Sequence, residues 1–317
     1  MDKRKLGNTD LLVSPIAFGG NVFGWTLDEK KSFEILDGFV DAGFNFIDTA
    51  DIYSKWVPGN TGGESEKIIG NWMKSRNTRN KIILTTKVAG DMGDGKKGLS
   101  KKHILEAVDA SLLRLQTDYL DLYQSHYEDP ETPIQETLEA YDQLIRAGKI
   151  RWIGASNYSP ESFKEALETS QHLSLPKYQT FQPEYNLYQR AGFEKQMQEI
   201  CLDNNIGVIS YYALASGFLT GKYRSEEDLG KSARGGGVKD FMNERGFRIL
   251  KALDEVSEQY NSTPASVAIA WLIARAAVTA PIASVTSLNQ LQDLSKAATL
   301  KLGVEDISIL DEASAWS

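Results

Sequence analysis

Cysteine and histidine are scarce in this sequence, which has one cysteine and three histidines among its 317 residues. The single cysteine, Cys201, cannot form a disulfide within the chain, and this fits a reducing compartment. Cys201 lies in the pattern QEICLDNN, which predicts a buried position on a helix. Because there is no HExxH motif and no cysteine pair, we expect no zinc site and no other bound metal.

Long apolar runs and an excess of positive charge are also missing. No run of about 18 apolar residues occurs, so no membrane span is expected. The first residues, MDKRKLGNTD, lack the apolar stretch of a signal peptide. Lys and Arg number 35 against 43 Asp and Glu, and this net charge of −8 argues against nucleic acid or an anionic membrane as partner. We therefore expect a cytoplasmic protein with a small-molecule partner. The sequence does not indicate its oligomeric state.

What the sequence does have is a regular alternation of short β-prone runs with longer amphipathic stretches. Strands alternating with helices favour a parallel sheet, and eight such units favour an α/β fold of the (β/α)8 or TIM-barrel type. An open, doubly wound sheet is the structural alternative. The eight expected strands are Ile16–Phe18, Asn45–Asp48, Ile82–Lys87, Leu120–Ser125, Arg151–Ala155, Thr180–Gln182, Val208–Tyr211 and Thr279–Ala283.

Local signals predict several element ends. Gly148 follows QLIRA, as expected where a helix ends in a left-handed residue. Helix N-caps are expected at four hydroxyl residues, three of them followed by proline: Thr132, Ser159, Thr263 and, without proline, Ser100.

The two ends of the fold show further patterns. RKLGNTDLLVSP predicts a β-hairpin that plugs the N-terminal end of the barrel. The stretch 221–246, with glycines at 235–237 and many charges, predicts a long mobile loop after the seventh strand. No linker separates two domains, so residues 1–317 are expected to form one barrel domain.

Polar residues follow several of the expected strands at their C-terminal ends. Asp48, Lys87 and His126 end the second, third and fourth strands, and Tyr53 lies five residues beyond Asp48. In a (β/α)8 barrel these strand ends meet on one face, which is where active sites occur. The other strand-end polar residues are Ser156, Asn157, Gln182 and Tyr211.

These residue types suit acid–base chemistry on an oxygen atom. A free tyrosine has a pKa of about 10, and a neighbouring Lys87 ammonium is expected to lower the pKa of Tyr53. Asp48 would keep Lys87 charged in a partly dry site, and His126 could orient a substrate oxygen. Only one acid, Asp48, ends a strand, so the carboxylate pair of a glycoside hydrolase is missing.

The chain resembles the aldo-keto reductase superfamily along nearly its full length. The motifs that carry the resemblance are FIDTADIY, TTK, residues 98–126 ending in DLYQSH, IRWIGASNYSP and TGKY. The resemblance implies hydride transfer from a reduced nicotinamide to a carbonyl carbon, with Tyr53 as proton donor. It implies that Lys87, held by Asp48, depresses the pKa of Tyr53, and that His126 positions the substrate oxygen. The family binds its cofactor without a GxGxxG motif, and this sequence has none.

The resemblance also implies the cofactor contacts, in groups along the barrel mouth. A phosphate site after strands seven and eight is independently expected for this fold. The carboxamide group would bind Ser156, Asn157 and Gln182, with Asp48 nearby; Tyr211 would stack on the nicotinamide; Gly20 and Asn21 would lie at its ribose; Leu214, Ser216, Gly217, Leu219 and Lys222 would surround the pyrophosphate; Arg234, Ser284, Thr286, Asn289 and Asp293 would lie on the adenosine side.

One departure from the family pattern concerns the choice of cofactor. The segment PIASVTSLNQLQD has no basic residue before Lys296, so a 2′-phosphate would lack a charge-assisted bond there. The resemblance favours NADP(H), and the missing cation leaves NAD(H) open.

The loops at the expected mouth of the barrel contain aromatic residues, which suit a small apolar or aromatic carbonyl substrate. A nicotinamide-binding regulatory subunit or redox sensor with little turnover is the functional alternative. The expected substrate residues are Phe23, Trp25, Trp56 and Tyr127.

Overall fold

Eight parallel strands form a ring in the computed structural model, which describes residues 1–232 and 235–316. The sheet runs in the order β10-β3-β4-β5-β6-β7-β8-β9. Its two edges meet where Val208 bridges Val278 and the Ile282 N–H donates to the Ser210 carbonyl at 2.7 Å. The barrel and its eight strands are therefore confirmed, and the open sheet is excluded. The strands are β3 Ala17–Gly19, β4 Phe46–Asp48, β5 Ile83–Val88, β6 Leu120–Ser125, β7 Ile150–Ser156, β8 Thr180–Gln182, β9 Gly207–Val208 and β10 Ile282–Ala283.

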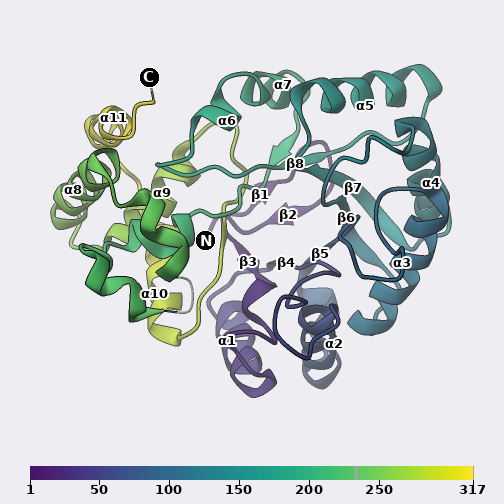
Figure 1. Cartoon of the computed structure of the whole chain (residues 1–317), viewed down its shortest axis with the longest axis horizontal. Coiled ribbons are helices and arrows are strands. Elements are labelled where there is room, and N and C mark those ends of the chain that lie inside the picture. The colour runs from purple at the N-terminus through teal and green to yellow at the C-terminus, as the bar shows by residue number, and fades with distance from the viewer. Residues whose placement is uncertain (233–234, 317) are drawn as a thin grey trace.

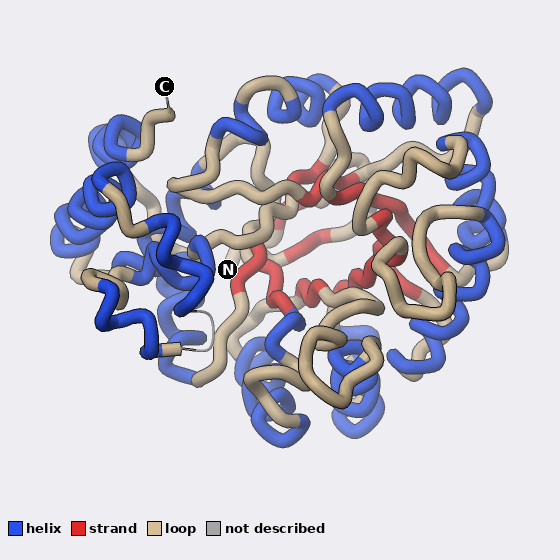
Figure 2. The backbone as a smooth tube through the Cα atoms, viewed as in Figure 1, coloured by secondary structure: helices blue, strands red, loops and turns tan. Residues whose placement is uncertain are grey.

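Helices surround the ring of strands on the outside (Figures 1 and 2). Most of them bury one apolar face against the sheet, whereas α9 is buried over nearly its whole length. Within the described residues, no helix has both the length and the apolar character that crossing a bilayer requires. The helices are α1 Glu29–Asp41, α2 Glu64–Arg76, α3 Lys101–Leu115, α4 Ile134–Arg146, α5 Pro160–Leu173, α6 Ala191–Glu194, α7 Met197–Asp203, α8 Glu244–Gln259, α9 Pro264–Ala274, α10 Leu288–Ala297 and α11 Val304–Ala313.

Three of the four predicted helix caps are confirmed. The side chains of Ser100, Ser159 and Thr263 each accept a hydrogen bond from a backbone N–H in the first turn of α3, α5 and α9. The Thr132 cap is wrong: its hydroxyl donates to Asp129 at 2.8 Å, and Pro133 takes the N-cap position of α4. After α4 ends, Gly148 has φ +71°, as predicted.

The predicted N-terminal hairpin is present and closes one end of the barrel. Strands β1 (Arg4–Lys5) and β2 (Leu12–Val13) pair antiparallel. Apolar side chains of the hairpin, among them Leu6 and Leu11, pack against Phe46 and Leu122 inside the ring. The N-terminal end of the barrel therefore has an apolar floor, and this leaves the C-terminal end for a polar site.

The segment after β9 differs from the loop predicted for 221–246. It contains the short 3-10 helices η3 (Ala215–Thr220), η4 (Glu226–Lys231) and η5 (Gly235–Phe241), and α8 already begins at Glu244. Buried contacts hold the segment, such as Phe218 against Phe241 with ring centroids 5.7 Å apart. Arg234 lies outside the described residues, and the mobility of this segment stays a prediction. Two further 3-10 helices are η1 Gly20–Val22 and η2 Arg79–Lys81.

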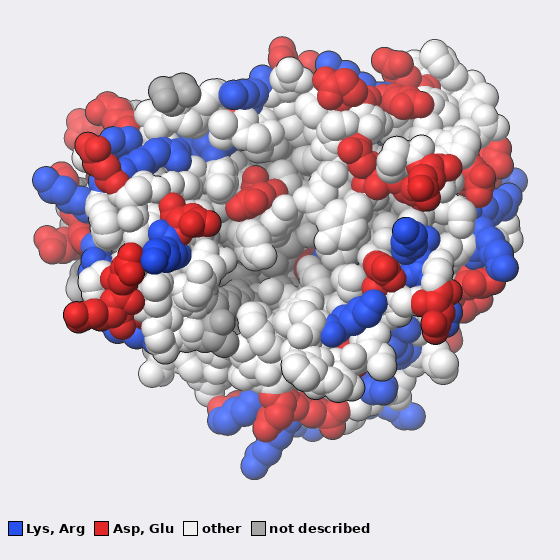
Figure 3. Space-filling view, in the orientation of Figure 1, with Lys and Arg blue, Asp and Glu red and all other residues white. Residues whose placement is uncertain are grey.

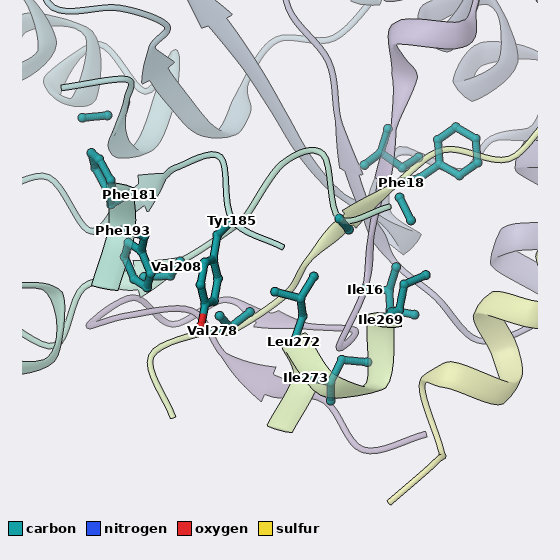
Figure 4. Close-up of a cluster of buried hydrophobic side chains, with 14 of the residues drawn as sticks. Ile16, Phe18, Phe181, Tyr185, Phe193, Val208, Ile269, Leu272, Ile273 and Val278 are labelled. Atoms are coloured by element: carbon teal, nitrogen blue, oxygen red, sulfur yellow. The ribbon is translucent and has the colours of Figure 1, made fainter. Parts of the chain in front are cut away.

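The main hydrophobic core lies between the ring of strands and the helices. Figure 4 shows one part of it, where Phe181 and Val208 from the sheet lie with Leu272 of α9. Cys201 of α7 is buried in this layer, as predicted.

Gly70 marks a close approach between two of these helices and gives a test of the packing. A Cβ atom at Gly70 of α2 would overlap the Arg114 carbonyl oxygen and lie 2.7 Å from the Leu115 carbonyl carbon of α3. We expect Gly70→Ala to lower the free energy of unfolding by about 1–3 kcal/mol, measured by urea denaturation. Gly192→Ala on α6 is the control, because its Cβ would meet no atom within 4 Å. Equal midpoints for the two variants would contradict this packing.

Candidate active site

The centre of the barrel becomes polar above its apolar floor. Asp48 ends β4 and Lys87 lies on β5, and both side chains are fully buried. The Lys87 ammonium donates to Asp48 Oδ2 at 2.6 Å and to the Thr49 carbonyl at 2.8 Å. Gln182, at the end of β8, donates to the other Asp48 oxygen at 2.9 Å. The Asp48 carboxylate is thus paired on both oxygens, which makes burial of the charge tolerable.

Tyr53 lies on the loop after β4, which returns over the strand ends. Its hydroxyl is 3.0 Å from the Lys87 Nζ and 3.5 Å from Asp48 Oδ2. The His126 ring lies edge-on to it, with centroids 5.9 Å apart, and stacks on Tyr127 at 4.6 Å. The structure therefore brings together the four residues that the sequence placed at neighbouring strand ends.

Burial dominates the protonation of this cluster. It raises the pKa of Tyr53 well above its usual range, and the Asp48 carboxylate adds to the rise. Lys87 is not among the causes of this rise, so the expectation that its ammonium depresses the pKa of Tyr53 stays a prediction. Burial also lowers the pKa of Lys87, against the opposing Asp48 charge. Burial is the main cause that lowers the pKa of His126 well below its usual range, and the Lys87 charge lowers it further, so the imidazole is neutral.

A cavity of about 810 Å³ opens above the cluster. Figure 3 shows a hollow at the centre of the molecule, surrounded mostly by uncharged atoms, with many Lys, Arg, Asp and Glu side chains towards the edge. Its described lining includes most of the predicted site residues: Asn21, Asp48, Tyr53, Trp56, His126, Tyr127, Ser156, Asn157, Gln182, Tyr211, Leu214, Ser216, Gly217, Lys222, Ser284, Thr286 and Asp293.

Several predicted residues lie elsewhere. Phe23 is fully buried and stacks on Phe18 at 5.2 Å, because η1 turns its ring into the core. Leu219 is also fully buried in the core, since η3 directs it away from the cavity. Trp25 packs edge-on to Trp56 at 5.7 Å. Lys87 lies in the cluster with Asp48 and Tyr53 but is not among the described lining. The other predicted residues not among the described lining are Gly20, Phe23, Trp25, Leu219 and Asn289, and Arg234 lies outside the described residues.

The polar groups on β7 and the loops beside it already bond to one another. The Ser156 hydroxyl donates to the Gln182 carbonyl at 2.8 Å, and the Asn157 amide donates to the His126 carbonyl at 3.0 Å. The Tyr211 hydroxyl donates to Asn157 Oδ1 at 2.7 Å, which fixes the Tyr211 ring at the cavity wall. These hydrogen bonds hold the polar groups of β7 and its neighbouring loops in a fixed arrangement at the cavity wall.

The chain after β9 is strained, as often occurs at functional sites. Tyr212, Ala215 and Ser216 have φ values of +54°, +46° and +56°, and Gly217 follows at +95°. A Cβ at Gly217 would lie 3.4 Å from the Lys222 Nζ, so the backbone here lies open beside a cation. This combination suits an anionic group such as a pyrophosphate.

The far end of the cavity includes residues that sequence reasoning missed. The start of α9 contributes Thr263, Pro264 and Ala265, and α10 contributes Gln290. The proline after a hydroxyl cap was visible in the sequence as a helix start, but its position at the cavity depends on how α9 packs. Tyr212 was missed because strand alternation would direct it away from Tyr211.

Among the described residues, no group of three His, Cys, Asp or Glu side chains is placed to hold a metal ion.

Comparisons with known proteins identify the family to which this chain is similar. The profile of the Aldo/keto reductase family matches residues 15–315. The chain is 34% identical over 319 residues to the uncharacterized oxidoreductase YrpG of Bacillus subtilis, covering 98% of this chain and 95% of that protein. It is 34% identical over 297 residues to the aldo-keto reductase YhdN of the same organism, covering 92% and 85%. It is 33% identical over 310 residues to a probable voltage-gated potassium channel subunit beta of Arabidopsis thaliana, covering 94% and 91%.

The chain belongs to the aldo-keto reductase family. Membership makes it an oxidoreductase that uses a nicotinamide cofactor on carbonyl compounds.

Proposed function

We propose that this protein reduces an aldehyde or ketone to an alcohol, with Tyr53 as the general acid. The observation that carries the proposal is the Lys87 ammonium, 3.0 Å from the Tyr53 hydroxyl and 2.6 Å from Asp48. The group lies at the base of a cavity of about 810 Å³, large enough for a cofactor and a small substrate. Residues 1–317 would act as one domain, in the cytoplasm.

The cavity fits a nicotinamide dinucleotide. Tyr211 offers a fixed ring beside the catalytic cluster, and Lys222 with the open backbone at Gly217 offers a phosphate site. Ser156 and Asn157 offer polar groups for the carboxamide. When bound, the reduced nicotinamide supplies the hydride that the carbonyl carbon receives.

The residues of this chain supply the proton and its stabilisation. Tyr53 is protonated at neutral pH and can donate to the carbonyl oxygen as negative charge develops there. Lys87, held by Asp48, then stabilises the phenolate that Tyr53 becomes. The neutral His126 can donate a hydrogen bond to the same oxygen and position it.

The preference between the two nicotinamide cofactors follows from the charges in the cavity. Lys222 is the one Lys or Arg among the described lining residues, and none accompanies Thr286 at the far end. We propose NADP(H) as the preferred cofactor on the family pattern, with NAD(H) also accepted, and expect the kcat/KM preference to stay below about a hundredfold. Steady-state kinetics and fluorescence titration with both cofactors measure it. A larger preference that Arg234→Ala abolishes would contradict this and assign the phosphate to Arg234.

Turnover of 4-nitrobenzaldehyde with NADPH tests the reductase directly. The expected result is steady oxidation of NADPH that depends on the aldehyde. A second candidate is favoured by the potassium channel subunit beta to which the chain is similar, namely a nicotinamide-binding regulatory subunit. Tight NADPH binding with no turnover of any test carbonyl would support that candidate against the reductase.

A further inference from the structure

Three large aromatic side chains remain half exposed around the mouth of the cavity. Trp56, Tyr127 and Tyr212 have 50%, 46% and 49% of their surface exposed, and all three line the cavity. Burying such rings against a ligand is favourable, and aromatic pairs add a preference for flat partners. The cavity therefore presents unused apolar ring surface where a substrate would enter.

These three rings come from different sides of the barrel. Trp56 and Tyr127 follow β4 and β6, and Tyr212 follows β9, which lies three positions from each of them around the closed ring. Tyr127 is fixed by stacking on His126, and Trp56 packs edge-on to Tyr53 at 6.2 Å. Tyr212 therefore comes from the side of the ring opposite the loops of Trp56 and Tyr127, and all three line the cavity that Tyr53 also lines.

The backbone holds Tyr212 in this unusual place. Its φ of +54° reverses the alternation of the strand, so that it lines the same cavity as Tyr211. The Tyr212 carbonyl accepts hydrogen bonds from the buried Asn186 amide at 3.0 Å and from the Ala215 N–H at 2.7 Å. The Tyr212 ring lies edge-on to the Tyr211 ring, with centroids 5.2 Å apart.

The charge around these rings restricts the substrate further. The ionised side chains among the described lining are Asp48, Lys222 and Asp293. Asp48 is paired with Lys87, Lys222 follows η3 in the chain, and Asp293 lies on α10. Apart from Lys222, the described lining residues include no Lys or Arg that could pair with an anionic substrate.

We propose that Tyr212 determines substrate specificity, by enclosing a flat, uncharged aromatic carbonyl between its ring and those of Trp56 and Tyr127. The inference rests on the proposed reductase function and adds the substrate class and the residue that selects it.

The test compares 2-naphthaldehyde with propanal in the wild type, Tyr212→Ala and Tyr212→Phe. For Tyr212→Ala we expect KM for 2-naphthaldehyde to rise about tenfold, while KM for propanal and the Kd for NADPH stay within about twofold. Tyr212→Phe should keep the wild-type values, because the ring and not the hydroxyl makes the contact. Leu113→Ala is the control for removal of an exposed apolar side chain, since Leu113 on α3 is 79% exposed.

A second readout does not depend on turnover. Calorimetric titration of 2-naphthaldehyde into the protein loaded with NADP⁺ should show the same tenfold loss of affinity in Tyr212→Ala. Equal affinities in wild type and Tyr212→Ala, or an equal loss in Tyr212→Phe, would overturn the assignment of the ring. If the wild type reduces propanal and Tyr212→Ala leaves KM for 2-naphthaldehyde unchanged, the reductase function is supported and the specificity role of Tyr212 is refuted. Absence of turnover with both carbonyls would remove the reductase, and the titration would still decide whether Tyr212 binds aromatic carbonyls.

Discussion

Replacement of Tyr53 by phenylalanine is expected to lower kcat for carbonyl reduction by at least about a hundredfold. The change removes the hydroxyl that lies 3.0 Å from the Lys87 Nζ and leaves the aromatic ring in place. Lys87 keeps its hydrogen bonds to Asp48 and to the Thr49 carbonyl, so the cluster should stay folded. The Kd for NADPH, measured by fluorescence titration, should remain within about twofold of the wild type.

Tyr123→Phe is the matched control, because it removes a buried phenol hydroxyl that has no hydrogen-bond partner among the described residues and does not line the cavity. Its kcat should stay near the wild-type value. A Tyr53→Phe variant with near-normal kcat would show that another group protonates the alkoxide. Since burial raises the pKa of Tyr53, the wild-type rate of reduction should show no loss from Tyr53 ionisation between about pH 6 and 9.

The second large effect concerns stability and arises from Asp51, which has 2% of its surface exposed. No side chain among the described residues donates a hydrogen bond to either carboxylate oxygen of Asp51. Burial raises the pKa of this carboxyl to about 8 and the Glu66 carboxylate adds to the rise, whereas Arg114, the Ile52 backbone N–H and Lys87 oppose it. The folded protein therefore holds a proton on Asp51 that the unfolded chain, with a pKa near 3.8, releases.

The sign of the pH effect follows from this difference. Below the unfolded pKa the carboxyl is neutral in both states and costs nothing, whereas between about pH 4 and 8 each pH unit costs the fold about 1.4 kcal/mol. At pH 7 the cost reaches about 4 kcal/mol. We expect Asp51→Asn, which resembles the neutral acid, to recover at least about 2 kcal/mol at pH 7.

Urea denaturation of both proteins from pH 5 to 8 measures this prediction. The stability difference between Asp51→Asn and the wild type should grow with pH, because the wild type alone carries the titrating group. Asp41→Asn, on the exposed side of α1, should show no such growth. A difference that stays constant with pH would mean that Asp51 is hydrated or paired in solution.

Most of the barrel could be predicted because its strands are short, buried on both faces and separated by amphipathic helices. The proposed catalytic cluster could be predicted for a related reason, since Asp48, Lys87 and His126 lie at or next to the ends of strands and parallel strand ends meet. The hairpin and three helix caps depend on contacts a few residues apart, which the sequence shows directly. The Thr132 cap failed because Asp129, three residues away, binds that hydroxyl instead.

What could not be predicted depends on three-dimensional burial. The sequence shows an ammonium near a phenol but not the burial that raises the pKa of Tyr53. It places Phe23 in a mouth loop, but the ring turns into the core and packs on Phe18. Tyr212 owes its position to a positive φ, which is uncommon for a residue other than glycine. Asp51 belongs to the motif FIDTADIY, and the sequence does not show that its carboxylate lacks a side-chain partner once the chain is folded.

The hairpin at the N-terminal end of the barrel restricts where substrate and cofactor can enter. Because Leu6 and Leu11 close that end, substrate, product and cofactor would all enter and leave through the opening of the cavity at the C-terminal end. A compound bound between Trp56, Tyr127 and Tyr212 would therefore block both substrate binding and product release. The lifetime of each complex is then governed at the entrance, far from the sealed base.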